Sequence, residues 1–123
     1  MSKLGFAAIS IAAAAFAGVA LAQEAPGRIT GGMLTDNAGM TLYAFDRDAG
    51  GKSACNGPCA ANWPPFTGAG DAKASGEWSL IARDDGSKQW AFRGKPVYHW
   101  SKDKKPGDMT GDGFNGVWHV VKG

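Results

Sequence analysis

From residue 23 onward, the chain consists of short stretches of alternating apolar and polar residues, separated by turn-forming residues. Two of these stretches, 78–83 and 88–93, flank Asp85-Gly86, a dipeptide that favours a tight hairpin turn. Alternation with a period of two is typical of half-buried β-strands. The pattern therefore predicts an antiparallel hairpin over residues 78–93.

Three further stretches have the same character. Residues 96–101 and 117–121 each alternate, and a shorter strand is expected at residues 28–30. The whole chain contains nineteen glycines and five tryptophans, which favour short strands, tight turns and an aromatic core over long helices. We therefore expect a mainly β protein.

The chain also resembles itself at an offset of 55 residues. Residues 39–48 align with residues 94–103, and Trp63 aligns with Trp118 in the same register. The shared pattern places a glycine, an aliphatic residue, a tyrosine, an aromatic residue and an aspartate at fixed positions, which is typical of a duplicated structural unit. The prediction is a small antiparallel β domain made of two degenerate repeats.

Five aromatic residues of the repeat are candidates for a core or for a ligand site. Within one strand, alternate residues share a face, so Tyr98 and Trp100 point the same way, as Tyr43 does with its neighbour at 45. Core packing is the first interpretation, because buried ring pairs stabilise small domains strongly; an aromatic platform for a ligand is the second. The candidates are Tyr43, Trp63, Tyr98, Trp100 and Trp118.

The first 22 residues have the form of a secretory signal peptide. An uncharged run over residues 4–21 follows Lys3 and ends on the small-residue motif Ala20-Leu21-Ala22. We predict cleavage after Ala22; the alternative is an uncleaved anchor, because the run approaches the length of a bilayer span. No cysteine directly follows the run, so the prediction is a periplasmic or secreted protein that is not a lipoprotein.

Removal of the leader leaves residues 23–123, enough for a single domain with a modest core. The two repeat halves, 39–66 and 94–121, and the hairpin between them are expected to form this domain. The mature chain has twelve basic and eleven acidic residues, a formal charge of +1, which does not predict nucleic-acid binding. No apolar run after the leader is long enough to span a membrane.

Cys55 and Cys59 lie four residues apart in the segment Ser-Ala-Cys-Asn-Gly-Pro-Cys. Two cysteines in an oxidising compartment usually pair, and closing a loop of about five residues stabilises the fold by roughly 2 kcal/mol. A regular helix over both would hold their Cβ atoms about 5–6 Å apart, too far for a disulfide. Asn56-Gly57 favours a turn and Pro58 a first helical position, so a helical turn is predicted only over 58–62.

Three other uses of the cysteines stay open. One is a thiol redox centre, although the common redox motif has two residues between its cysteines and not three. Another is covalent haem attachment, although Ala60 stands where a histidine is required. The third is a copper-type site of both cysteines, a histidine and a methionine, because these ligands suit copper.

His99 and His119 are the only histidines of the chain and form a candidate metal site with Met109. If their strands are neighbours, they could hold copper or transfer protons; packed or surface histidines are the plainer interpretation. Residues 108–113 follow part of a calcium-loop pattern. His119 stands where that pattern needs a bidentate acid, so a glycine-rich connection is favoured there.

Four segments carry a resemblance to a known family: TLYAFDRD, GKSACNGPCAANWPPF, DGSKQWAFRGKPVYHW and KKPGDMTGDGFNGVWHVV, within residues 39–121. They are similar to the bacterial secreted repeat of unknown function, whose members are often labelled predicted lipoproteins. The chain departs from part of that family because it has no lipid-attachment cysteine and a single pair of repeats. The resemblance implies a secreted or envelope location and no particular activity.

No Ser/His/Asp spacing, phosphate-binding glycine loop or basic aromatic groove is visible, so an enzyme is not predicted. We expect a non-catalytic module that binds an envelope protein or a small ligand. The alternative is a periplasmic metal-handling protein of the copper type, or an electron-transfer accessory protein, that uses the histidines or the cysteines. A hydrolase or transferase is a third hypothesis.

Overall fold

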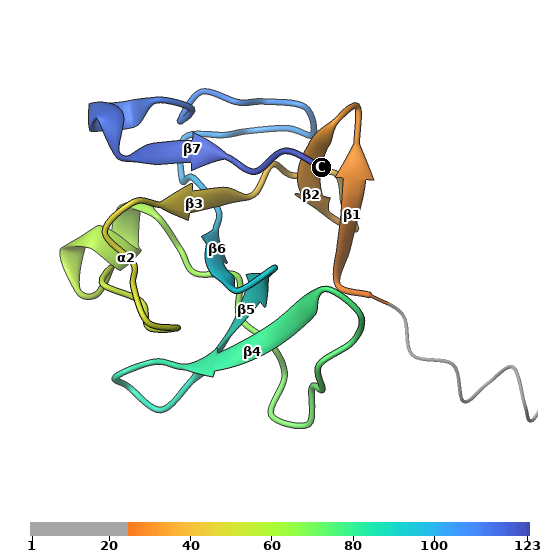
Figure 1. Cartoon of the computed structure of the whole chain (residues 1–123). Helices are drawn as coiled ribbons and strands as arrows, with labels where there is room; N and C mark the ends of the chain where they lie inside the picture. The colour runs from red at the N-terminus through yellow and green to blue at the C-terminus, as the bar shows by residue number, and fades with distance from the viewer. Residues whose placement is uncertain (1–24) are drawn as a thin grey trace, which may run out of the picture.

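The computed structural model describes residues 25–123, so the predicted leader and its cleavage site lie outside the described residues. The protein is mainly β, with two antiparallel sheets, as the sequence predicts (Figure 1). One sheet pairs β1 (Gly27–Thr30) with β2 (Met33–Asp36). The other has five strands in the order β4 (Trp78–Ala82), β5 (Lys88–Phe92), β6 (Lys95–Tyr98), β3 (Tyr43–Phe45) and β7 (Trp118–Val120).

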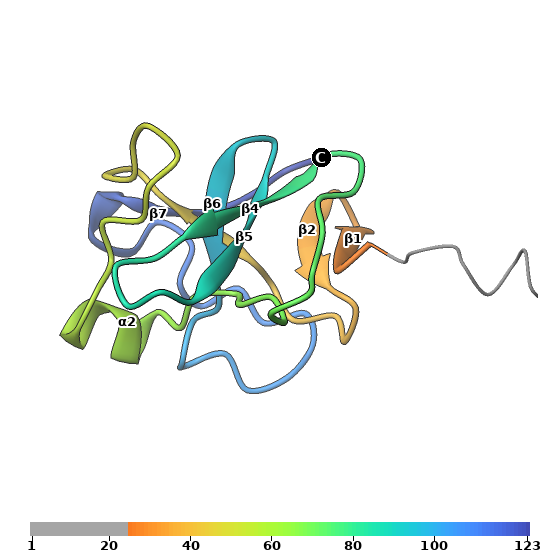
Figure 2. The same ribbon diagram turned by 90° about the horizontal axis from the view of Figure 1, so that it is seen from below.

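Two short helical segments complete the described part of the chain. The helix α2 (Pro58–Asn62) begins with a proline in its first turn, as predicted, and leads directly into the buried Trp63. A 3₁₀ turn, η1 (Phe114–Gly116), precedes β7. Figures 1 and 2 both place α2 and the β1–β2 hairpin at opposite ends of the molecule.

The two repeats meet at the centre of the five-stranded sheet. β3 pairs with β6 so that Tyr43 lies directly opposite Tyr98, the residue at the same position of the other repeat. Tyr43 also pairs with Val120 on its other side, and Tyr98 pairs with Pro65, which again are positions 55 residues apart. The repeats are therefore related by an approximate two-fold axis that passes between the two tyrosines.

Two hydrophobic clusters lie on opposite faces of this sheet, because successive side chains of a strand point to opposite sides. The first cluster contains the aromatic residues shared by the repeats; its buried members are Tyr43, Cys55, Trp63, Tyr98, Trp100, Trp118 and Val120. The second cluster includes residues of the β1–β2 and β4–β5 hairpins. Its buried members are Leu34, Leu42, Trp78, Trp90, Phe92 and Val97.

The hairpin predicted over 78–93 is β4 and β5, and the short strand expected at 28–30 is β1. The strand expected at 96–101 is shorter in the structure. β6 ends at Tyr98, because the backbone N–H groups of His99 and Ser101 donate to the carbonyls of Pro64 and Asn62, just after and at the end of α2. β2 was not predicted. Within residues 25–123, no helix is long and apolar enough to cross a membrane.

Candidate functional site

The two tyrosines each donate a hydrogen bond to the aspartate of the other repeat. The Tyr43 hydroxyl donates to Asp103 Oδ2 at 2.7 Å, and the Tyr98 hydroxyl donates to Asp48 Oδ2 at 2.6 Å. The pKa of each tyrosine lies well above the usual value. Burial is the larger cause, and the hydrogen bond to the aspartate is the second. Asp48 and Asp103, the aspartates of the shared repeat pattern, therefore join the two repeats.

The three candidate tryptophans and Phe45 form one continuous stack. Trp63 and Trp118 lie parallel at the centre, with ring centroids 3.9 Å apart and an interplanar angle of 2°. Trp100 stacks on the outer side of Trp63, and Phe45 on the outer side of Trp118. The tryptophans of this stack are at most 7% exposed. The rings are therefore core, and they leave no open aromatic platform in this conformation.

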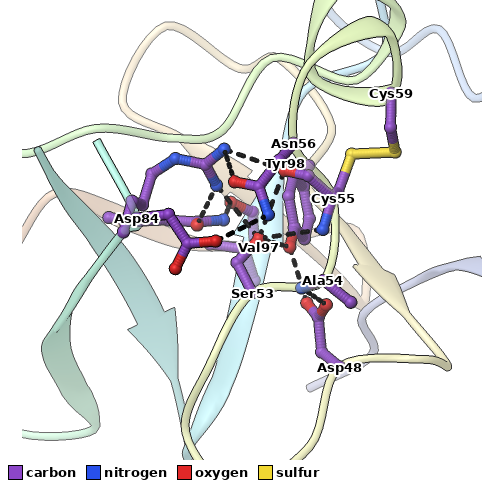
Figure 3. The surroundings of a disulfide bond; sticks show 11 residues. Asp48, Ser53, Ala54, Cys55, Asn56, Cys59, Asp84, Val97 and Tyr98 are labelled. Atoms are coloured by element: carbon purple, nitrogen blue, oxygen red, sulfur yellow. Dashed lines mark hydrogen bonds between the residues drawn. A yellow bond between two sulfur atoms is a disulfide. The ribbon is translucent and has the colours of Figure 1, made fainter. Parts of the chain in front are cut away.

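The disulfide predicted between Cys55 and Cys59 is present in the structure, with Cα atoms 5.2 Å apart (Figure 3). Cys55 is buried completely, and its carbonyl oxygen accepts a hydrogen bond from Arg83, which is only 8% exposed. The Arg83 guanidinium donates four bonds in all: to the Cys55 carbonyl, Ser53 Oγ, Gln89 Oε1 and Asn56 Oδ1. The loop that carries the disulfide is thus attached to the β4–β5 hairpin by a buried cation.

Arg83 has no ion pair with a carboxylate within residues 25–123, but it is linked to Asp48 through shared hydrogen-bond partners. Ser53 Oγ contacts both Arg83 and the Tyr98 hydroxyl, which in turn donates to Asp48. Burial raises the pKa of Asp48, while the Ala54 N–H, the Tyr98 hydroxyl and the charge of Arg83 oppose the rise. This network is internal, and its polar groups already satisfy one another.

The two histidines each bond a different aspartate. His99 Nε2 lies 2.8 Å from Asp36 Oδ2, and His119 Nε2 lies 2.8 Å from Asp46 Oδ2. Their strands are not neighbours, because β3 lies between β6 and β7. Within residues 25–123, no three His, Cys, Asp or Glu side chains form a cluster that could hold a metal ion.

The third residue of the metal hypothesis, Met109, is 42% exposed in the loop before η1. In the same loop, Asp108 Oδ2 accepts the backbone N–H groups of Lys104 and Lys105, and these bonds lower the pKa of the Asp108 carboxyl. Asp112 Oδ1 accepts the backbone N–H of Val120. The part of the calcium-loop pattern present here thus makes structural turns, as the sequence favours.

Within residues 25–123, a groove lies open over β3, and we call it the Ala44 groove. It consists of two adjoining hollows, of about 250 Å³ and about 400 Å³, that share Ala44, Asp46 and Lys95. The smaller hollow is lined further by Phe45, Asp48, Ala49, Gly50, Gly51, Gly94 and Pro96. The larger is lined further by Phe92, Arg93, His119, Val120, Val121 and Lys122.

A departure from the repeat symmetry opens this groove. The position of Ala44 in the second repeat is His99, whose ring packs edge-on against Phe66 with centroids 5.2 Å apart. The alanine supplies no such ring, and its strand neighbours on the same face are Val97 and His119. Sequence reasoning named His119, as a candidate metal ligand, but did not predict the groove, although the alanine opposite a histidine in the repeat alignment was a visible signal.

Arg93 is the most unusual residue of the groove. It has φ 51° and precedes Gly94 with φ 84°, so the two make the tight turn between β5 and β6. Such a turn favours asparagine or glycine at its first position, and an arginine in the left-handed region is uncommon. Arg93 Nε donates to Glu77, and its guanidinium carbon lies 4.9 Å from the centroid of the Phe92 ring.

Comparison with known proteins identifies the family from the sequence. A family model described as a secreted repeat of unknown function matches residues 27–67 and 79–122. The first match includes the β1–β2 hairpin and β3, and the second includes nearly all of the β4–β5 hairpin and β6. No curated protein and no solved structure shows significant similarity to the chain. Since the two matches cover most of the chain, the protein belongs to the family of secreted repeats of unknown function.

Proposed function

We propose that this protein is a non-catalytic binding module that acts in the periplasm or outside the cell, and that it binds its ligand in the Ala44 groove. The observation that carries the proposal is the contrast between this groove and the rest of the domain. The tyrosines, Asp103 and Arg83 are bonded inside the fold. The groove instead combines open space with charged side chains of both signs on a sheet made rigid by the aromatic stack.

A second candidate, metal or electron-transfer chemistry at the histidines or the cysteines, has less support. Each histidine is already paired with an aspartate, and the cysteines are joined. A bound metal would have to replace these partners, whereas a ligand in the groove replaces only water.

The experiment that tests the proposal is site-specific photo-crosslinking in cells that produce the full chain. A photoreactive amino acid is placed at Lys95, which lines both hollows, and for comparison at Lys102, an exposed lysine that lines neither. We expect a discrete adduct from position 95 and not from position 102. The adduct should be lost when Ala44→Trp fills the groove and kept when the exposed helix residue is changed by Ala61→Trp. No adduct, or the same adducts from both positions, would contradict the proposal.

A further inference from the structure

We propose that the Ala44 groove is selective for a small organic acid whose carboxylate or phosphate group is bound by Arg93; this inference rests on the proposed function. The first argument is charge. The larger hollow is lined by three cations, Arg93, Lys95 and Lys122, and by a single acid, Asp46. Asp46 Oδ2 lies 2.8 Å from His119 Nε2, so this carboxylate oxygen already has a hydrogen-bond partner.

The smaller hollow adds one further acid, Asp48, but its two carboxylate oxygens accept bonds from Ala54 N and from the Tyr98 hydroxyl. Glu77 is the other acid near the site; its carboxylate accepts a hydrogen bond from Arg93 Nε and forms an ion pair with Arg93. The cations therefore outnumber the acids that face the larger hollow, which favours an anion there.

The second argument is the position of Arg93. Its backbone N–H donates to the Glu77 carbonyl at 2.8 Å, its Nε donates to the Glu77 carboxylate, and its guanidinium lies over Phe92. Within residues 25–123, the terminal nitrogens Nη1 and Nη2 donate no hydrogen bond, and the side chain is half exposed. A guanidinium fixed in this way presents a pair of N–H groups that matches the two oxygens of a carboxylate or phosphate.

The third argument is that the arginine is unfavourable for the turn in which it lies. Asparagine before Gly94 would suit the φ of 51° better. Residues that break a local rule of this kind are concentrated at functional sites, where the side chain serves a purpose other than the turn.

The fourth argument is the shape of the groove. A volume of about 400 Å³ lies in the range of small-molecule sites. Ala44, Phe92 and Val121 give it an apolar lining beside the cations. A ligand with an apolar body and one anionic end fits this combination better than an inorganic ion, which would leave the apolar surface uncovered.

The test uses three probes of nearly the same shape and different charge: benzoate, benzamide and benzamidine. Their affinities for the native protein are measured by amide NMR titration at constant ionic strength. We expect benzoate to bind about tenfold or more tightly than benzamide, the ratio expected for a charge-assisted pair of hydrogen bonds, and benzamidine to bind most weakly. Phenyl phosphate tests the phosphate form: tighter binding than benzoate assigns a phosphate ligand, and weaker binding a carboxylate.

The Arg93→Asn variant separates binding from folding. Because asparagine suits the turn, R93N should be at least as stable as the native protein in urea and yet lose most of the difference between benzoate and benzamide. The control Lys102→Gln removes an exposed cation outside the groove and should leave that difference unchanged.

Three results overturn the inference. If benzamide or benzamidine binds in the groove as tightly as benzoate, the groove remains a binding site but is not selective for acids. If R93N keeps the preference for benzoate, Arg93 is not the anion-binding residue. If no probe shifts the amides of the groove, the inference fails as stated, while the crosslinking experiment decides the proposed function separately.

Discussion

Trp63 and Trp118, which occupy the same position in the two repeats, stack face to face at the centre of the domain with ring centroids 3.9 Å apart. Tyr43 packs edge-on against the first of these rings and Tyr98 against the second, with interplanar angles of 79° and 89°. These edge-on contacts lie within a repeat, whereas the stacking of Trp63 on Trp118 and on Trp100 joins the core of one repeat to that of the other. We conclude that the two repeats form one interlocked unit, since neither could bury its tryptophan in this way alone.

The hydrogen bonds that Tyr43 and Tyr98 donate to the aspartate of the other repeat should contribute measurably to stability. Tyr43→Phe leaves the buried Asp103, and Tyr98→Phe the half-buried Asp48, without one of its donors, so each should lower the free energy of unfolding by about 1–3 kcal/mol. Urea denaturation measures the change. His119→Gln breaks the exposed pair with Asp46 and should cost only about 0–1 kcal/mol. Equal losses in all three variants would show that the hydrogen bonds from the tyrosines stabilise the fold no more than the exposed His119–Asp46 pair does.

The same tyrosines predict instability at alkaline pH. Their pKa in the folded protein lies above the ordinary value of 10.0, so the unfolded chain releases these protons first. Their contribution is therefore fully present below about pH 10 and is lost as the pH rises above it. The chain contains only two tyrosines, so tyrosinate absorbance reports on this pair alone. It should rise together with unfolding, followed by tryptophan fluorescence; tyrosinate that forms while the fold is intact would contradict the assignment.

The Cys55–Cys59 disulfide should contribute less to the free energy of unfolding than Arg83, which lies beside it. Replacing both cysteines by alanine reopens a loop of about five residues and should cost about 2 kcal/mol. Arg83→Met leaves several buried acceptors without a donor. Each such group that water does not reach costs about 1–3 kcal/mol, so this substitution should lower the free energy of unfolding more than the loss of the disulfide does. Urea denaturation compares the two variants, and a larger effect of the cysteine pair would reverse this ranking.

Intact mass confirms the oxidation state on which that comparison depends. We expect the native protein to be two hydrogens lighter than the reduced chain and to resist thiol alkylation before reduction. Alkylation of the protein as purified would instead return Cys55 and Cys59 to the redox and copper hypotheses.

Gly111 should tolerate no side chain. A Cβ atom there would lie 2.6 Å from Trp63 and 3.0 Å from Trp100, inside the aromatic stack. Gly111→Ala should therefore lower the free energy of unfolding by about 1–3 kcal/mol, the usual cost of overfilling a core. Gly70→Ala is the matched control, because a Cβ atom there meets nothing within 4 Å. Thermal unfolding measures both, and equal midpoints would exclude close packing at Gly111.

Local patterns were sufficient to predict most of the elements. The Asp85-Gly86 turn identifies β4 and β5, and Pro58 marks the start of α2. β2 was missed even though Gly31-Gly32, with φ values of 59° and 86°, is a hairpin signal of the same kind. Its strands are only four residues long, too short for alternation alone to identify.

Contacts between residues far apart in the chain were harder to predict from the sequence. The alignment at an offset of 55 pairs the tyrosines and tryptophans correctly as equivalent positions, but equivalence in sequence does not reveal that Tyr43 lies opposite Tyr98. The groove was also missed, because it arises from a small side chain, Ala44, and from the orientation of Arg93 after a turn. The repeat alignment places Ala44 opposite His99, but it does not show that the missing ring leaves a groove.

The measurement that tests the central claim most directly is an amide NMR screen of the domain against small organic acids, bases, sugars and neutral aromatic compounds. We expect at least one class to cause saturable shifts that are concentrated around Ala44, Lys95 and His119. Ala44→Trp should abolish those shifts, and Ala61→Trp should keep them. Saturable shifts concentrated elsewhere, for example around Phe114 and Met109, or shifts unaffected by Ala44→Trp, would contradict a binding site in the Ala44 groove.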